Sequence, residues 1–343
     1  MPGPGPAVAA IRLAVRAAVA DLPPWSQVLV ACSGGADSLA LAAAAAFEGS
    51  RAGVRVGAVI VDHGLQVGSA QVAARAAEQC RALGLDPVDV VRVDVPASPA
   101  GPEEAARTAR YAALADAATR HTAAMILLGH TRDDQAEQVL LGLARGSGAR
   151  SLSGMPPTRG SYVRPLLGVS RTQTQAACAE AGLEPWLDPH NDDSRFARVR
   201  ARRAVADLER DLGPGLTAAL ARSADLLRDD ADLLDELAGQ ARAGLAAGEE
   251  PPESSSSAGP SNGGRAQGDV RVSVHAVAAL PAALRRRVWR ILAAEAGARS
   301  VSAVHVESLD ALVMAWRGQG TVDLPGGVVC ERVAGSIHLG RRR

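Results

Sequence analysis

Three short polar stretches, each placed directly after an apolar run, carry residue types suited to phosphate chemistry. Ser33–Ser38 follows the apolar residues that end at Ala31, Asp62-His63-Gly64-Leu65 follows a second apolar run, and Gly129–Asp134 follows a third. If these runs are parallel strands, their carboxyl ends meet at one edge of a sheet. The three stretches are therefore predicted to form one site.

The first stretch reads Ser-Gly-Gly-Ala-Asp-Ser and leads into an alanine-rich segment that is predicted to be helical. Two glycines allow a tight turn, and the helix start adds bare N–H groups and a partial positive charge, which together suit a phosphate. The stretch lacks the Gly-Lys-Ser/Thr ending of a Walker A loop. The alternative is a tight turn made for packing alone. The predicted nucleotide contacts are Ser33, Gly34, Gly35, Ala36, Asp37 and Ser38, with Asp62, His63 and Gly129 from the other two stretches.

The third stretch continues through Glu137 and combines a histidine with adjacent carboxylates. Thr131 and Asp134 have the spacing of a capping box at a helix start. His130 and Asp134 are four residues apart, so both can lie over the first turn. Carboxylates there can bind a divalent cation or accept a proton, although acids are also common at helix starts for electrostatic reasons alone. The predicted metal ligands are Asp37, Asp133 and Asp134.

Two groups of arginines are candidates for anion binding. Arg107 and Arg110 lie three apart and share a helix face, where they can hold a phosphate or carboxylate, or form an ordinary solvated face. The segment 195–203 has five arginines and no acid, which predicts contact with a phosphate backbone. With Arg145, the predicted RNA contacts are Arg195, Arg198, Arg200, Arg202 and Arg203.

The elements that must position these residues alternate between short apolar runs and helical segments up to residue 144, with predicted strands that include 55–62 and 125–128 and predicted helices that include 132–144 and, later, Val205–Asp211. This alternation predicts an α/β fold with a doubly wound, mostly parallel sheet. A smaller, mainly helical second domain is expected after it, with short strands around Val322 and Ile337. The predicted domains are 1–212 and 213–343, the second interrupted by a low-complexity tract at 248–268 that is expected to be flexible.

Composition narrows the class of protein. The 343 residues carry no net charge and no lysine, so every fixed side-chain cation is an arginine and any RNA surface must come from local clustering. The four cysteines are far apart in the sequence and form no C-x-x-C pair, which argues against a zinc site or paired-thiol sulfur chemistry. Neither a signal peptide nor a membrane span is predicted, and we expect a cytoplasmic protein.

These stretches, in this order, resemble the PP-loop ATP pyrophosphatase superfamily and, within it, most closely the tRNA(Ile)-lysidine synthetase family. The resemblance covers residues 25–212 strongly. It continues more weakly through Leu280–Arg287 and Val322–Gly327, which resemble that family's substrate-binding domain. Its other matching stretches are Arg107–Tyr111, Arg145–Gly148, Leu152–Met155, Arg164–Leu167 and Asp188–Asn191.

The resemblance implies that the enzyme uses ATP and Mg²⁺ to adenylate O2 of the wobble cytidine in the CAU anticodon of tRNA(Ile). The ε-amine of L-lysine would then displace AMP to form lysidine. Pyrophosphate would lie on Ser33–Ser38. Asp37 and Asp134 would face Mg²⁺ or the amine, and Arg110 and His130 the substrate or the transferring group, so these four are the predicted catalytic residues. Relatives also suggest a homodimer.

Three departures from the family pattern and two alternative functions accompany this interpretation. The family often has arginine where this chain has Gln66, and an asparagine where it has Val199. Longer members also have an extra C-terminal β domain for which we find no matching segment. The alternatives are another PP-loop tRNA-modifying enzyme, such as a thiolase or an amidotransferase-type synthetase, and a non-catalytic ATP-binding or RNA-binding module.

Overall fold

The computed structural model describes residues 3–64, 66, 68–96, 101–146, 148–188, 193–247 and 268–342. Most of the predicted tract at 248–268 lies outside these ranges, as do Leu65 and the segment 189–191 that was matched to the family. The chain forms two compact units, Met1–Arg228 and Asp229–Arg343. The predicted domain boundary at 212/213 lies ahead of this division, which falls inside one long helix, α9 (Leu216–Ala247). No helix among the described residues is both long and apolar enough to cross a membrane.

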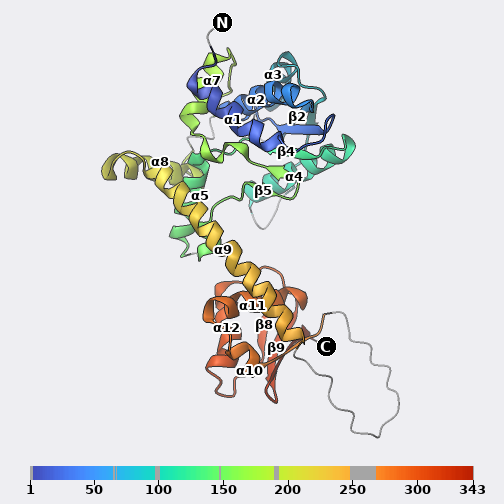
Figure 1. Ribbon diagram of the computed structural model, residues 1–343, viewed down its shortest axis with the longest axis vertical. Helices are drawn as coiled ribbons and strands as arrows, with labels where there is room; N and C mark the ends of the chain where they lie inside the picture. The colour runs from blue at the N-terminus through green and yellow to red at the C-terminus, as the bar shows by residue number, and fades with distance from the viewer. Residues whose placement is uncertain are drawn as a thin grey trace. The chain divides into compact units, whose positions relative to one another are not determined.

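The first unit is built on a six-stranded sheet with the order β3-β2-β1-β4-β6-β5 (Figure 1). Its strands are β1 (Gln27–Ala31), β2 (Arg55–Asp62), β3 (Val88–Arg92), β4 (Met125–Leu128), β5 (Thr158–Arg159) and β6 (Tyr162–Val163). All neighbouring pairs are parallel except β5 and β6, which are antiparallel. The predicted doubly wound α/β fold is therefore confirmed.

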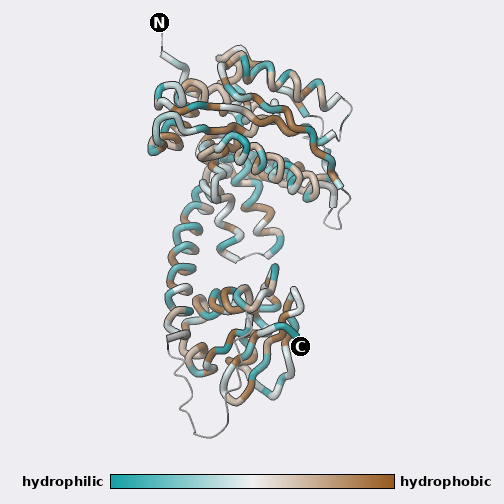
Figure 2. Tube along the Cα trace, turned by 90° about the vertical axis from the view of Figure 1, so that its right-hand side faces the viewer, coloured by the Kyte–Doolittle hydropathy of each residue, from teal (hydrophilic) through white to brown (hydrophobic). Residues whose placement is uncertain are grey.

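The first unit has the helices α1 (Pro6–Val19), α2 (Ala36–Ala52), α3 (Ser69–Ala82), α4 (Pro102–Arg120), α5 (Arg132–Ala144), α6 (Ala149–Leu152), α7 (Arg171–Glu180) and α8 (Ala197–Leu212), with the 3-10 turn η1 (Pro165–Gly168) before α7. Helices pack on both faces of the sheet. In β1, Val28 and Val30 face one hydrophobic cluster with α1, α2 and α3, while Leu29 faces a second cluster with α4. A strand buried on both faces needs a continuous apolar run, and β1, β4 and the middle of β2 have one. Figure 2 shows hydrophobic residues gathered along the strands inside this unit.

The order of the strands determines where on the sheet a binding crevice forms. In this order, β1 lies between β2 and β4, so the chain winds outward in opposite directions from the β1–β4 pair. A crevice forms at such a switch point, outside the carboxyl ends of the strands. The loops after β1 and β4 are Ser33–Gly35 and Gly129–Thr131, so the first and third predicted stretches meet there.

The second unit contains more strand than the sequence predicted. After α9 come β7 (Val270–Ser273), α10 (Val274–Ala278), α11 (Ala282–Glu295) and α12 (Ala303–Met314), then β8 (Val322–Leu324), β9 (Val328–Val333) and β10 (Ser336–Arg341). The four strands form an antiparallel sheet in the order β7-β10-β9-β8. Its core includes Trp289, which is fully buried, together with Leu292 and Leu309.

A buried polar cluster in this unit supports a stability prediction. Asp310 accepts hydrogen bonds from Arg285 Nε at 2.6 Å and from Trp289 Nε1 at 3.0 Å. Replacing Asp310 with alanine leaves both buried donors without this acceptor, so we expect the second unit to lose about 3 kcal/mol of unfolding free energy. Urea unfolding of the second unit, monitored by tryptophan fluorescence and circular dichroism, measures this loss. As a control, Asp323→Ala removes an ion pair with Arg342 whose side chains are 67% and 70% exposed, and it should cost under about 0.5 kcal/mol. Equal losses in the two variants would contradict the prediction.

Candidate active site

The Ser33–Ser38 loop has the form of an anion cradle. Gly34 has a φ of +84°, and a Cβ there would lie 3.2 Å from Ala76 Cβ, so glycine is required by both conformation and space. The Ser38 hydroxyl accepts from the Ser33 N–H at 3.1 Å and donates to the Gly35 carbonyl at 3.0 Å, which closes the turn. No side chain caps the start of α2, so its first N–H groups can receive an anion.

The loop after β4 lies against the first loop. A Cβ on Gly129 would be 3.1 Å from backbone atoms of Asp37 and Ser38, closer than an unstrained contact allows. Glycine at 129 therefore lets the two loops touch. The predicted capping box at the start of α5 is present, with Thr131 N–H donating to Asp134 Oδ2 at 2.7 Å.

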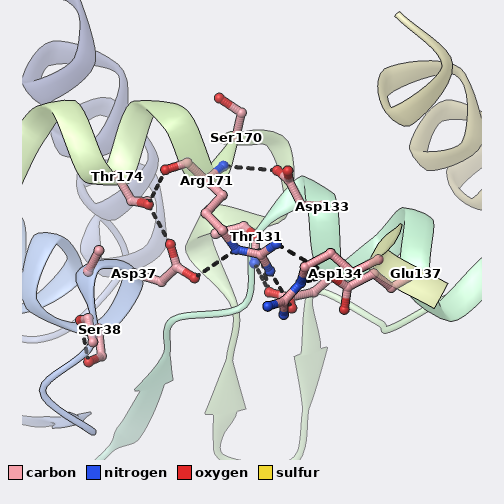
Figure 3. A network of polar contacts seen from close by, with 12 residues as sticks. Asp37, Ser38, Thr131, Asp133, Asp134, Glu137, Ser170, Arg171 and Thr174 are labelled. Carbon is pink, nitrogen blue, oxygen red and sulfur yellow. Dashed lines mark hydrogen bonds and ion pairs between the residues drawn. The ribbon is translucent and has the colours of Figure 1, made fainter. Parts of the chain in front are cut away.

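The carboxylates of both loops converge on a residue that the sequence did not single out, Arg171 (Figure 3). Its guanidinium lies 3.2 Å from Asp134 Oδ1, 3.3 Å from Glu137 Oε1 and 3.7 Å from Asp37 Oδ2. Asp37 also accepts a short hydrogen bond from the Thr174 hydroxyl. In sequence, Arg171 is only the first residue of a helix, and its partners lie far away along the chain, so no local signal could have identified it.

Burial and neighbouring charges shift the pKa values of Asp37 and Asp134 in opposite directions. Burial raises the pKa of Asp37, and the nearby Asp134 and Asp133 add to this rise against the opposing effects of Thr174 and Arg171. Burial also opposes ionisation of Asp134, but Arg171 and the Thr131 N–H outweigh it and lower the pKa of Asp134. Asp134 is thus held as a carboxylate.

The predicted metal ligands do not form a single cluster. Asp133 turns away and accepts the backbone N–H of Arg171 at 2.9 Å, so it caps α7. Among the described residues, no group of three or more His, Cys, Asp or Glu side chains is arranged to hold a metal. The oxygen donors of Asp37 and Asp134 remain chemically suited to Mg²⁺.

Close to Asp134 lies a group of nitrogen-bearing side chains, Arg110, His63 and His130. Nδ1 of His63 and Nδ1 of His130 are buried, and neither has a hydrogen-bond partner among the described residues. Burial and the nearby Arg110 lower the pKa of His63. Burial lowers the pKa of Arg110 itself, and Arg107 and Arg198 lower it further. An anion entering here would meet a buried guanidinium and two imidazoles.

Burial also lowers the pKa of His130 from its ordinary value of 6.5 to about 3, with Arg110 and Arg198 contributing. The unfolded chain therefore binds a proton at this residue between these two pH values, and the folded chain does not. Stability must fall as the pH drops below 6.5, and His130→Asn should remove this part of the loss. Between pH 7 and pH 5 we expect the variant to lose about 2 kcal/mol less unfolding free energy than the wild type. Urea unfolding of the first unit at the two pH values measures the difference, and equal losses would contradict the prediction.

Asp62 has a local role in the structure. Its Oδ1 accepts the Gly64 N–H at 2.9 Å, and the carboxylate is buried. The pKa of Asp62 is lowered because the Gly64 and Ser69 hydrogen bonds and Arg92 outweigh the effect of burial. It therefore shapes the turn that carries His63.

The structure divides the arginines predicted to contact RNA into two sets. Arg145, Arg195, Arg200 and Arg203 are exposed, whereas Arg198 and Arg202 are partly buried. Arg202 Nε donates to Glu137 Oε1 at 2.8 Å, so it belongs to the carboxylate network. Residues 198 and 202 lie one helical turn apart on α8, which begins at Ala197 rather than at the predicted Val205.

The site just described has counterparts in known proteins. Residues 11–209 match the PP-loop domain family, and residues 273–338 match the TilS substrate binding domain. The tRNA(Ile)-lysidine synthase of Thermobifida fusca is 52% identical over 340 residues, covering 98% of both chains. That of Streptomyces coelicolor is 48% identical over 369 residues, covering 98% of this chain and 99% of its own.

A solved structure supports the fold alone. The U34-tRNA thiolase of Methanococcus maripaludis superposes with a TM-score of 0.54 at 18% identity, covering 65% of this chain and 80% of its own. The likeness to the lysidine synthases is far stronger and extends through the second unit. Both domain families match, and about half of the residues are identical to these synthases over nearly the full length of the chain. This chain therefore belongs to the tRNA(Ile)-lysidine synthase family, whose PP-loop domain uses ATP.

Proposed function

We propose that this enzyme joins L-lysine to C2 of the wobble cytidine in the CAU anticodon of tRNA(Ile), at the expense of ATP. In the first step, O2 of the cytidine attacks the α-phosphate and pyrophosphate leaves. In the second step, the ε-amine of lysine attacks C2 of the adenylated cytidine, AMP leaves, and the amine loses a proton. Lysidine, AMP and pyrophosphate are the products.

One observation supports the assignment of roles: N–H donors and nitrogen-bearing side chains lie on one side of the site, and carboxylates lie on the other. On the first, Ser33–Ser38 and the α2 start would hold the pyrophosphate part of ATP, while Arg110 and the unpartnered imidazoles of His63 and His130 would face the α-phosphate. Negative charge develops on phosphoryl oxygens during transfer, and prepositioned donors stabilise it.

On the second side, the carboxylates exceed their cations. Asp37, Asp134 and Glu137 share two guanidinium groups, from Arg171 and Arg202. Glu137 Oε2 is buried and has no hydrogen-bond partner among the described residues. An ammonium group of lysine would satisfy this oxygen. A carboxylate beside the amine can also accept its proton before attack.

Four further assignments belong to this proposal. Asp37, within the phosphate-binding loop, and Asp134 would hold Mg²⁺, which neutralises phosphate charge when bound. The exposed Arg145, Arg195, Arg200 and Arg203 would contact the tRNA backbone. We also propose a homodimer, measurable by light scattering, and a cytoplasmic location, which suits four free thiols.

The test combines the protein with ATP, Mg²⁺, radiolabelled lysine and a tRNA(Ile) transcript with a CAU anticodon. We expect label on the tRNA and one pyrophosphate released for each lysine attached. A matched transcript with uridine at the wobble position should accept no label. Pyrophosphate release without lysine-dependent labelling of the CAU transcript would contradict the proposal and favour another PP-loop reaction.

A further inference from the structure

Arg171 joins three separate elements of the active site. Its guanidinium contacts Asp37 on α2 and both Asp134 and Glu137 on α5, while its own backbone belongs to α7 (Figure 3). The contacts point in different directions: Nε toward Asp37, Nη2 toward Asp134 and Nη1 toward Glu137. A planar guanidinium can serve three acceptors at once, which a compact ammonium on a flexible stem cannot do in the same geometry.

The first turn of α7 is fixed in a way that delivers this side chain. Ser170 and Gln173 form a capping box, with Ser170 N–H donating to Gln173 Oε1 at 2.9 Å. The backbone N–H of Arg171 donates to Asp133 Oδ2 at 2.9 Å, which ties α7 to the start of α5. Thr174, one turn later, donates to Asp37 and so ties α7 to α2. Hydrogen bonds that do not involve the guanidinium therefore fix α7, which carries Arg171, against both α5 and α2.

The charges around Arg171 show what it does electrostatically. The side chain is 20% exposed, and the Glu137 side chain only 2%. The carboxylates of Asp37, Asp134 and Glu137 all contact this one guanidinium. Neighbouring carboxylates repel one another strongly when water is excluded, so without a cation between them they would protonate or move apart. Although burial disfavours its charge, the carboxylates raise the pKa of Arg171, so it stays a cation throughout the working pH range.

We propose that Arg171 is a positioning residue: a resident cation that holds Asp37 of the phosphate-binding loop and Asp134 of the second loop in one arrangement before any substrate binds. In the described part of the chain, its guanidinium contacts the phosphate-binding loop through Asp37 alone and makes no contact with Arg110, His63 or His130. Its effect on the reaction passes through the carboxylates that it orients. The identity of the reaction rests on the proposed function, whereas the structural role of Arg171 does not.

Chemical rescue tests this role. Arg171→Ala removes the guanidinium, and we expect kcat for lysine transfer to fall roughly 100-fold because the reacting groups lose their alignment. Guanidinium chloride at low millimolar concentration should restore part of kcat and raise the melting temperature of this variant. Urea, which has the same planar shape without the charge, should do neither. Arg171→Lys keeps the charge but not the fork, so it should melt close to the wild type and still lose most of kcat.

Arg16→Ala is the matched control for lost stability. Arg16 pairs with the buried Glu48 at 2.8 Å, away from the site, so its loss should lower the melting temperature and leave kcat near the wild-type value. The assignment is overturned if urea rescues Arg171→Ala as well as guanidinium does, or if Arg171→Lys retains wild-type kcat. If Arg171→Ala does not fold, the lysine variant decides. The melting experiments also separate this role from the proposed function, because they need no lysine transfer and remain informative if the wild type attaches none.

Discussion

Asp37→Asn is expected to lower the rate of lysine transfer about 1,000-fold and to leave the fold intact. Asparagine has nearly the same shape, and its side-chain oxygen can still accept the Thr174 hydroxyl that Asp37 accepts in the structure. The lost negative charge, however, is the one nearest the phosphate-binding loop on the carboxylate side of the site. The variant would lose both a Mg²⁺ ligand and the partner that faces Arg171 at 3.7 Å.

The measurement is single-turnover attachment of labelled lysine, with circular dichroism and melting temperature recorded on the same samples. Asp89→Asn serves as the control, because Asp89 is a carboxylate of the same sheet that pairs with Arg120 at 2.9 Å and has no contact with the site. The control should transfer lysine at close to the wild-type rate. Near-normal transfer by Asp37→Asn would remove Asp37 from the metal and catalytic assignments.

Arg110→Ala is expected to lower the adenylation rate by about 100- to 1,000-fold. Burial has the largest effect on the pKa of Arg110, followed by Tyr111, Arg107 and Arg198, and among the described residues no carboxylate forms an ion pair with Arg110. A guanidinium held in place without an acidic partner is available to the α-phosphate, whose oxygens gain charge in the transition state. Its loss would affect the first chemical step more than the second.

Release of labelled pyrophosphate in the absence of lysine isolates that first step. Arg120→Ala is a control from the same helix, since Arg120 lies at the end of α4 and pairs with Asp89. It should release pyrophosphate at the wild-type rate. If Arg110→Ala adenylates normally and fails only when lysine is added, Arg110 acts on the amine transfer and our assignment of the two sides of the site is wrong.

Local signals in the sequence determined most of the first unit. The strand bounds 55–62 and 125–128 and the helix 132–144 agree with the structure to the residue, because apolar runs, glycines and the Thr131–Asp134 capping box act within a few residues of one another. The same holds for the Ser33–Ser38 turn, whose glycines leave few conformations. The alternation of strand and helix then predicts which loops share the sheet edge.

Less of the fold of the second unit could be predicted from the sequence. The strand β7 pairs with β10, and β9 lies between β10 and β8, so each strand is stabilised by partners distant in sequence. Short segments with four to six residues carry little periodicity of their own. The expectation of a mainly helical domain missed β7 and β9 for that reason.

The sequence by itself determined the fold class of the first unit, the position of the Ser33–Ser38 turn and the family to which the chain is similar. Only the tertiary structure decided which charged side chains pair with one another. Arg171 is recognisable as part of the site only when α7 packs beside α2 and α5. Arg202 and Arg200 have different roles because they lie on different faces of α8: Arg202 points toward Glu137, whereas Arg200 is exposed to solvent. Caps and strands depend on near neighbours, whereas the partner of a buried charge depends on the packing of the whole unit.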